Sequence, residues 1–234
     1  ETIEIPEKKW NYDSEIIGID IPVVAVMGIG QNVQKFDLQL YLRSRFIDKG
    51  YKVSQIGTKK ISGLFGLHPL PDFLFNTQYS DVDKVYAFNR VMKDVSMQEK
   101  PDVILLGIPD SLLPLNNKHR FSFGLYAYEI FNAVQPDFVI TSLMANNGYN
   151  DEFYSEISKM AKYKYNVNID AYFVSQFCPL SNSIWSEKLS YVYLSRMELP
   201  KTEYKVYTTS DLNNDILFKQ AEKKLLLYGK YEQY

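Results

Sequence analysis

The sequence contains few of the residues that build disulfide-bonded or metal-bound folds. Its 234 residues include one cysteine, Cys178, and two histidines, His68 and His119. A single cysteine excludes an internal disulfide and a multi-cysteine zinc site, and neither histidine belongs to a HExxH motif. We therefore expect no metal site and a cytoplasmic protein, in which Cys178 is a buried small residue and His68 a structural hydrogen-bonding partner.

An excess of charge of one sign is also absent. The chain carries 26 basic and 28 acidic side chains with no block of like charge. Neither nucleic acid nor an anionic membrane surface is therefore an expected partner. No apolar run reaches the length of a membrane span, and no signal peptide is visible. These features leave the oligomeric state open.

Short apolar runs that alternate with longer amphipathic segments dominate the rest of the chain. This order is typical of an α/β protein with a doubly wound, mainly parallel sheet and helices on both faces, a Rossmann-like or P-loop-NTPase-like three-layer sandwich. We expect a linker or docking arm at 1–20 and a single α/β domain at 21–234, the C-terminal domain of a longer protein. The pattern predicts strands at 21–27, 51–56, 169–173 and 189–194, and two more strands after the Pro-Asp pairs at 101–102 and 136–137. It predicts one helix that ends at Gly50 and another that ends near Met97. Three further helices are expected at 121–134, 151–163 and 211–228.

The turn after the first predicted strand has the form of a phosphate-binding loop. Such loops close with Gly-Lys-Ser/Thr, so that backbone N–H groups and the lysine bind phosphate while the hydroxyl binds magnesium. Here the closing triplet is Gln34-Lys35-Phe36, in a loop that otherwise resembles that of dethiobiotin synthetase and its relatives. Either the altered loop still binds an anion, or it is a vestigial turn whose phenyl ring packs into the core. The candidate binding residues of this loop are Gly28, Gly30, Gln31, Asn32, Gln34 and Lys35.

A second candidate lies at the end of the apolar run 103–107. Asp110 follows this run, loosely like the acidic strand that holds magnesium in P-loop enzymes. Together with Lys35 it would support ATP or GTP binding with Mg²⁺, whereas the simpler interpretation is a turn-capping aspartate. The pair Gly28-x-Gly30 lacks the third glycine of a dinucleotide fingerprint. By its position the segment 144–150 is a further candidate to line a ligand cleft, whereas the simpler interpretation is an asparagine-rich turn.

A long segment at 57–80 contains glycines and prolines but also many aromatic residues. Loops of this length are uncommon in compact domains and often functional, and the aromatic content favours a packed flap. We expect this flap to bind a peptide or protein partner through Phe65, His68, Phe73 and Phe75.

The run IPVVAVMGIGQNVQKFDLQLYLRSRFIDKGYKVSQIGTKKISGLFGLHPLPDFLF, with PDVILLGIP further on, resembles the peptide maturation system proteins of clostridial ribosomal-peptide clusters. These accessory proteins are found beside radical-SAM maturases and a small precursor peptide. The resemblance implies a role in bacteriocin-type natural product biosynthesis, with precursor peptide or maturation enzyme as partner, and it transfers no catalytic residue. The alternative function is an ATP- or GTP-dependent NTPase, kinase or ligase that uses Lys35 and Asp110, and whether the protein is an enzyme stays open.

Overall fold

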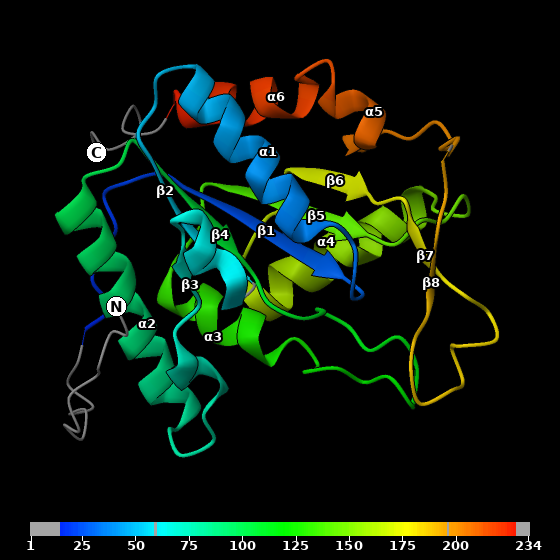
Figure 1. The fold of residues 1–234 in the computed structure, drawn as a ribbon, viewed down its shortest axis with the longest axis horizontal. Coiled ribbons are helices and arrows are strands. Elements are labelled where there is room, and N and C mark those ends of the chain that lie inside the picture. Colours follow the sequence, from blue (N-terminus) through cyan, green and yellow to red (C-terminus); the bar gives the residue numbers. More distant parts are fainter. Residues whose placement is uncertain (1–14, 59, 196, 228–234) are drawn as a thin grey trace.

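The structure, a computed structural model, describes residues 15–58, 60–195 and 197–227. In this part of the chain a seven-stranded parallel sheet has the order β3-β2-β4-β1-β5-β6-β9, and a separate antiparallel hairpin pairs β7 with β8 (Figure 1). The strands are β1 (Val23–Ile29), β2 (Val53–Gly57), β3 (His68–Pro69), β4 (Val103–Gly107), β5 (Phe138–Leu143), β6 (Ala171–Val174), β7 (Phe177–Pro179), β8 (Tyr191–Tyr193) and β9 (Val206–Tyr207).

Helices cover both faces of this sheet. In Figure 1, α1 and α6 lie above the sheet and α2, α3 and α4 below it. The central strands β1 and β4 are buried on both faces, which explains their continuous apolar sequence. The predicted three-layer α/β fold is therefore confirmed. The helices are α1 (Lys35–Asp48), α2 (Asp81–Glu99), α3 (Leu125–Ala133), α4 (Asp151–Tyr165), α5 (Thr209–Leu212) and α6 (Ile216–Leu225), with two 3-10 turns, η1 (Lys60–Phe65) and η2 (Asp72–Phe75).

The sequence pattern allows a Rossmann-like or a P-loop-like sheet, and the strand order differs from that of the dinucleotide-binding Rossmann fold. In the dinucleotide-binding fold the first strand lies beside the second, whereas here β1 pairs with β4 and β5, and β2 lies outside β4. The loop that follows β1 therefore lies between the loops that follow β4 and β5, at the carboxyl edge of the sheet, where ligands bind in such folds.

Three expected elements differ from the structure. The predicted helix 211–228 is divided into α5 and α6, because Asp215 adopts a left-handed conformation with a φ of 55°. The predicted edge strand 189–194 pairs in the β7–β8 hairpin and not with the main sheet. The flap 57–80 contains η1, β3 and η2, so it is packed as expected but has more regular structure. Residues 228–234 lie outside the described residues.

The segment that precedes β1 is attached to α2. The side-chain amide of Asn89 accepts from the Ile17 N–H and donates to the Ile17 carbonyl, both at 2.9 Å, and it also donates to the carbonyl of Ala133, the last residue of α3. Lys93 forms an ion pair with Asp20 at 2.9 Å. Residues 15–20 of the predicted arm thus contact the domain, while 1–14 lie outside the described residues. None of the described helices is long and apolar enough to span a membrane.

Candidate functional site

The loop between β1 and α1 has the backbone of an anion-binding turn. Asn32 and Gln34 adopt left-handed conformations with φ values of 55° and 56°, and Gly30 has a φ of 105°. A side chain at Gly30 would also collide with Met144, whose Cγ lies 2.8 Å from the position of an added Cβ. Left-handed residues spaced in this way form concave nests in which successive N–H groups converge.

Most N–H groups of this loop have no acceptor within the described part of the protein. The Gly30 N–H donates to Ser111 Oγ at 2.7 Å. In the described part of the chain, the N–H groups of residues 31–35 donate to no protein acceptor. They lie at the N-terminus of α1, where the helix dipole adds a partial positive charge. This arrangement favours an anion at the end of β1.

Lys35 extends from the first turn of α1 back across the loop. Its aliphatic chain packs against Gly28, where an added Cβ would lie 3.0 Å from Lys35 Cδ, and its ammonium donates to the Asp110 carbonyl. Burial lowers the pKa of Lys35 to about 8, although the nearby Asp110 carboxylate acts in the opposite direction. The structure thus brings together Lys35 and Asp110, which the sequence separates by 75 residues.

The Asp110 carboxylate is engaged on both oxygens. Oδ2 accepts from the Ser122 N–H at 2.7 Å and Oδ1 from Gln31 Nε2 at 3.3 Å. Asp110 has a φ of 55°, in the left-handed region that aspartate tolerates better than most residues. It therefore caps the turn after β4 and at the same time contacts the phosphate-type loop.

Gln34 connects the loop to the hairpin. Its Oε1 accepts from the Gln176 N–H at 2.8 Å, and Gln176 Oε1 accepts from the Tyr193 hydroxyl at 2.9 Å. The Gln34 side chain thus forms a hydrogen bond with the segment that follows β6. Sequence analysis had not identified Gln176, Ser111 or Ser142, whose hydroxyl donates to the Val33 carbonyl. The available signal was positional, because each follows or ends a strand at the carboxyl edge.

Phe36 occupies the position at which a P-loop hydroxyl would bind magnesium. It is 7% exposed, and its ring centroid lies 6.1 Å from that of Phe65 in the flap. A Cβ added at Gly57 would lie 3.4 Å from the Phe36 ring. The magnesium ligand of a P-loop is thus replaced by an apolar contact with β2 and η1, and these residues do not fit the metal. In the described residues, no cluster of three or more His, Cys, Asp or Glu side chains forms a metal site.

The four flap candidates are in different environments. Phe73 is 8% exposed and belongs to the core, so its assignment to a partner surface is corrected. His68 contacts the Glu99 carboxylate, which also accepts from the Ser54 hydroxyl. Phe65 and Phe75 are 57% and 40% exposed, and Leu64, which sequence analysis had not selected, is 85% exposed.

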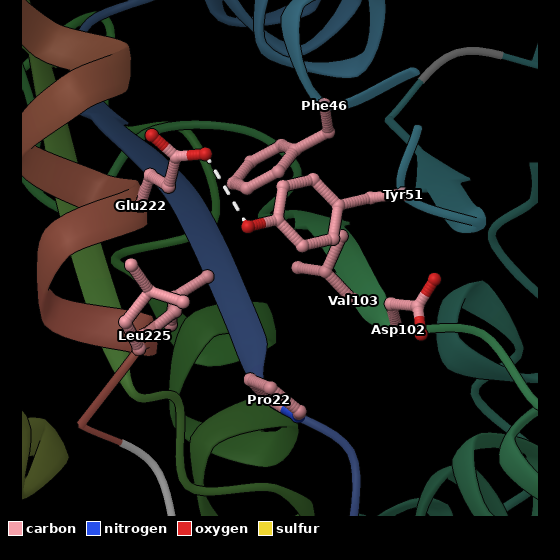
Figure 2. A pocket seen from close by; sticks show the side chains of 8 residues that line it. Pro22, Phe46, Tyr51, Asp102, Val103, Glu222 and Leu225 are labelled. Atoms are coloured by element: carbon pink, nitrogen blue, oxygen red, sulfur yellow. Dashed lines mark hydrogen bonds between the residues drawn. The ribbon is translucent and has the colours of Figure 1, made fainter. Parts of the chain in front are cut away.

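A small cavity lies at the opposite edge of the sheet. Figure 2 shows Tyr51 and Phe46 beside Leu225, with the Tyr51 hydroxyl donating to Glu222 at 3.3 Å. The cavity measures about 70 Å³, well below the roughly 300 Å³ of a small-molecule pocket. It lies at the amino ends of β1 and β4, away from the loop, and is a packing defect between α1 and α6.

No protein-family model and no curated protein matches this sequence. Among solved structures, a DUF1611 family protein from Anabaena variabilis is 14% identical with a TM-score of 0.48, over 67% of this chain and 46% of that one. Cobyrinic acid a,c-diamide synthase from Mycobacterium smegmatis, with bound ATP analogue and magnesium, is 16% identical with a TM-score of 0.48, over 91% and 97%. A MobB homolog from Bacillus stearothermophilus is 12% identical with a TM-score of 0.38, over 87% and 97%.

This chain spans about half the length of the first solved structures that it matches. The class of protein follows from the sheet and the loop described above. It is a three-layer α/β protein whose first β–α turn has the form of a phosphate-binding loop.

Proposed function

We propose that the loop 30–35 binds the phosphate group of a small ligand such as a nucleotide. The observation that carries this proposal is the set of unpaired N–H groups at the start of α1, together with the Lys35 side chain, which packs on Gly28 and donates to the Asp110 carbonyl. A bound phosphate would accept from these groups and would exchange the carbonyl contact of Lys35 for a charged one. The proposal concerns binding and does not require hydrolysis.

Calorimetric titration with AMP, ATP and GTP tests this proposal. We expect binding of at least one ligand, and Lys35→Ala should weaken it at least about tenfold, or about 1.4 kcal/mol. Lys49→Ala is the matched control, because Lys49 is exposed at the other end of α1 and should change nothing. If none of the three ligands binds at millimolar concentration, the proposal is wrong.

We also propose an accessory role in maturation of a ribosomally synthesised peptide, with the precursor peptide or a maturation enzyme as partner. The observation that favours it is the exposure of Leu64 and Phe65 in η1, beside the resemblance stated above. The Phe65 ring contacts Phe36, so a partner on η1 would adjoin the loop. Exposed apolar side chains of this kind often mark protein contacts.

Titration with the precursor peptide, alone and with the partner enzyme, tests this second proposal. The double substitution Leu64→Ser and Phe65→Ser should abolish binding, whereas Tyr163→Ser should not. Tyr163 is 87% exposed but lies on α4, below the sheet. Unchanged binding in the double variant would exclude η1 as the contact. An NTPase, kinase or ligase activity would instead appear as nucleotide turnover that is lost in Lys35→Ala and in Asp110→Asn.

A further inference from the structure

From the residues around the loop we infer that it binds a phosphate monoester without a divalent cation, and not a magnesium–nucleoside triphosphate. This inference rests on the proposed function, because it specifies the ligand of the same loop. It departs from the cofactor that the loop type implies, ATP or GTP with Mg²⁺.

The first reason is the side chain that follows Lys35. A P-loop places a hydroxyl there, which holds the cation against the phosphates. Phe36 is buried against Gly57 and Phe65, so an apolar ring fills that position. The hydroxyl of Ser62 packs on the same glycine and is completely buried, so it is closed to a hydrated cation. Magnesium gives up its water ligands reluctantly and prefers oxygen donors.

The second reason is the state of the carboxylates. Each Asp110 carboxylate oxygen already accepts a hydrogen bond, Oδ2 from the Ser122 N–H and Oδ1 from the Gln31 amide, so a cation would have to share these oxygens with two donors. A second acid, Asp37, lies in the first turn of α1, where it is exposed and one residue beyond Phe36. One residue corresponds to a rotation of about 100° around a helix, so Asp37 does not replace the missing hydroxyl.

The third reason is the charge of the site. Lys35 supplies one positive charge and the N-terminus of α1 about half of one, while a phosphate monoester carries about two negative charges at pH 7. The nearby Asp110 carboxylate offsets part of this positive charge, so even the charge of a monoester exceeds the positive charge of the site. Further phosphates would place more negative charge beside the Asp110 carboxylate, which Gln31 holds against the loop, with no cation to neutralise it.

Calorimetry with AMP and with ATP, each in EDTA and in excess Mg²⁺, tests this inference. We expect AMP to bind with the same affinity in both buffers, within about twofold, and ATP to bind no more tightly than AMP. A tenfold or greater gain in affinity from Mg²⁺, or a tenfold preference for ATP over AMP in EDTA, overturns the inference but leaves the proposed function intact. Absence of binding in all four titrations overturns the proposed function and the inference with it.

Two variants at one position provide an internal comparison. Phe36→Thr restores the hydroxyl, and we expect Mg²⁺ to tighten ATP binding at least about fivefold in this variant. Phe36→Leu keeps an apolar side chain and should remain insensitive to Mg²⁺. If Phe36→Thr does not fold, the wild-type titrations still decide the question. A Phe36→Leu protein that becomes Mg²⁺-dependent would contradict the account.

Discussion

Lys35 is a residue whose position costs stability. Burial lowers its pKa from 10.5 to about 8, which means that its charged form is less stable in the folded protein than in the unfolded chain. Its neutral partner in the free protein, the Asp110 carbonyl, compensates only in part. A charge kept in such a place is characteristic of binding sites, where stability and function often conflict.

We therefore predict that Lys35→Met stabilises the protein while it abolishes phosphate binding. The gain in free energy of unfolding should be about 1 kcal/mol, because methionine keeps the aliphatic contact with Gly28 and removes the buried charge. Urea denaturation measures it. Lys49→Met, at an exposed position, should stay within about 0.5 kcal/mol of wild type. A clear loss of stability in Lys35→Met would contradict the prediction.

The same pKa predicts how phosphate binding depends on pH. An anion favours the protonated amine and raises its pKa in the complex, so the free protein's value of about 8 sets where affinity begins to fall. Affinity should fall about twofold between pH 7 and pH 8, where half of the amine is neutral, and about tenfold per pH unit well above that. Calorimetry from pH 7 to pH 9.5 measures it. In Lys35→Arg, whose guanidinium stays charged, whatever affinity remains should not decrease over the same range.

At the residue scale, the sequence predicted where the loop lies between strand and helix, but not which distant residues form hydrogen bonds with it. The apolar run, the glycines and the helix start are local signals, and they located the turn correctly. The partners of the loop lie far away along the chain, with Ser111 at 81 residues from Gly30 and Gln176 at 142 residues from Gln34. No periodicity relates such positions, because only the sheet brings them together.

At the scale of elements, Gln34 links the phosphate-type loop to the β7–β8 hairpin. Its side chain accepts from Gln176, which in turn holds the Tyr193 hydroxyl. The hairpin is also held by the Ala145 N–H, which donates to the Phe177 carbonyl at 2.8 Å, and its residues Val192 and Tyr193 are exposed. A ligand that shifts the loop would therefore also shift the hairpin.

We predict that Gln34→Gly loosens the hairpin. The substitution removes the acceptor of the Gln176 N–H while glycine tolerates the left-handed backbone at this position. Hydrogen exchange at residues 176–179 and 191–194 should accelerate several-fold. Gln31→Gly, which removes a contact with Asp110 instead, should leave the exchange of the hairpin unchanged. Equal effects of both substitutions would refute a specific link through Gln34.

A buried ion pair connects α2 with α3. The side chains of Lys84 and Glu129 are 10% and 3% exposed and lie 3.1 Å apart, and burial raises the pKa of the Glu129 carboxyl while Lys84 opposes this effect. Removing one partner of such a pair leaves an uncompensated charge.

We predict that Lys84→Met lowers the free energy of unfolding by about 3–5 kcal/mol. The double variant Lys84→Met and Glu129→Leu should recover most of the loss, because two apolar side chains can pack where the two charges were. Thermal and urea unfolding of the single and double variants measures both effects. A single variant as stable as wild type would mean that Glu129 is protonated or solvated there.

The errors of sequence analysis at this scale share one cause. Helical periodicity continues through 211–228, but Asp215 leaves the helix and forms an ion pair with Arg45 of α1 at 2.6 Å. Phe73 lies in a flap segment yet is drawn into the core by η2. In both cases a tertiary contact overrides a local pattern. By contrast, α4 has a local cap at Asn150 and starts at the predicted residue, Asp151.

At the scale of the whole molecule, the strands differ in how deeply their side chains are buried. β1, β4 and β5 lie in the centre and their side chains are almost fully buried, whereas the residues of the hairpin strands are only partly buried or exposed. The order of the strands was not predictable, because alternation of apolar and amphipathic segments does not specify which strands are neighbours. Here β4 lies between β2 and β1.

This arrangement predicts a hierarchy of hydrogen exchange. Amides of β1, β4 and β5 should exchange only through global unfolding, while those of β7 and β8 should exchange through local opening at much lower free energy. Exchange followed by NMR at several denaturant concentrations separates the two classes. Exchange of β7 at the same free energy as β1 would show that the hairpin unfolds with the core.

Asn89 gives the molecule a mechanical property. One amide side chain forms hydrogen bonds with the N–H and the carbonyl of Ile17 and with the Ala133 carbonyl. A force applied to the chain before Ile17 is therefore transmitted to α2 before it reaches β1. The central strand is thereby shielded from tension at its own entry, and the load is spread over two helices on the lower side of the sheet.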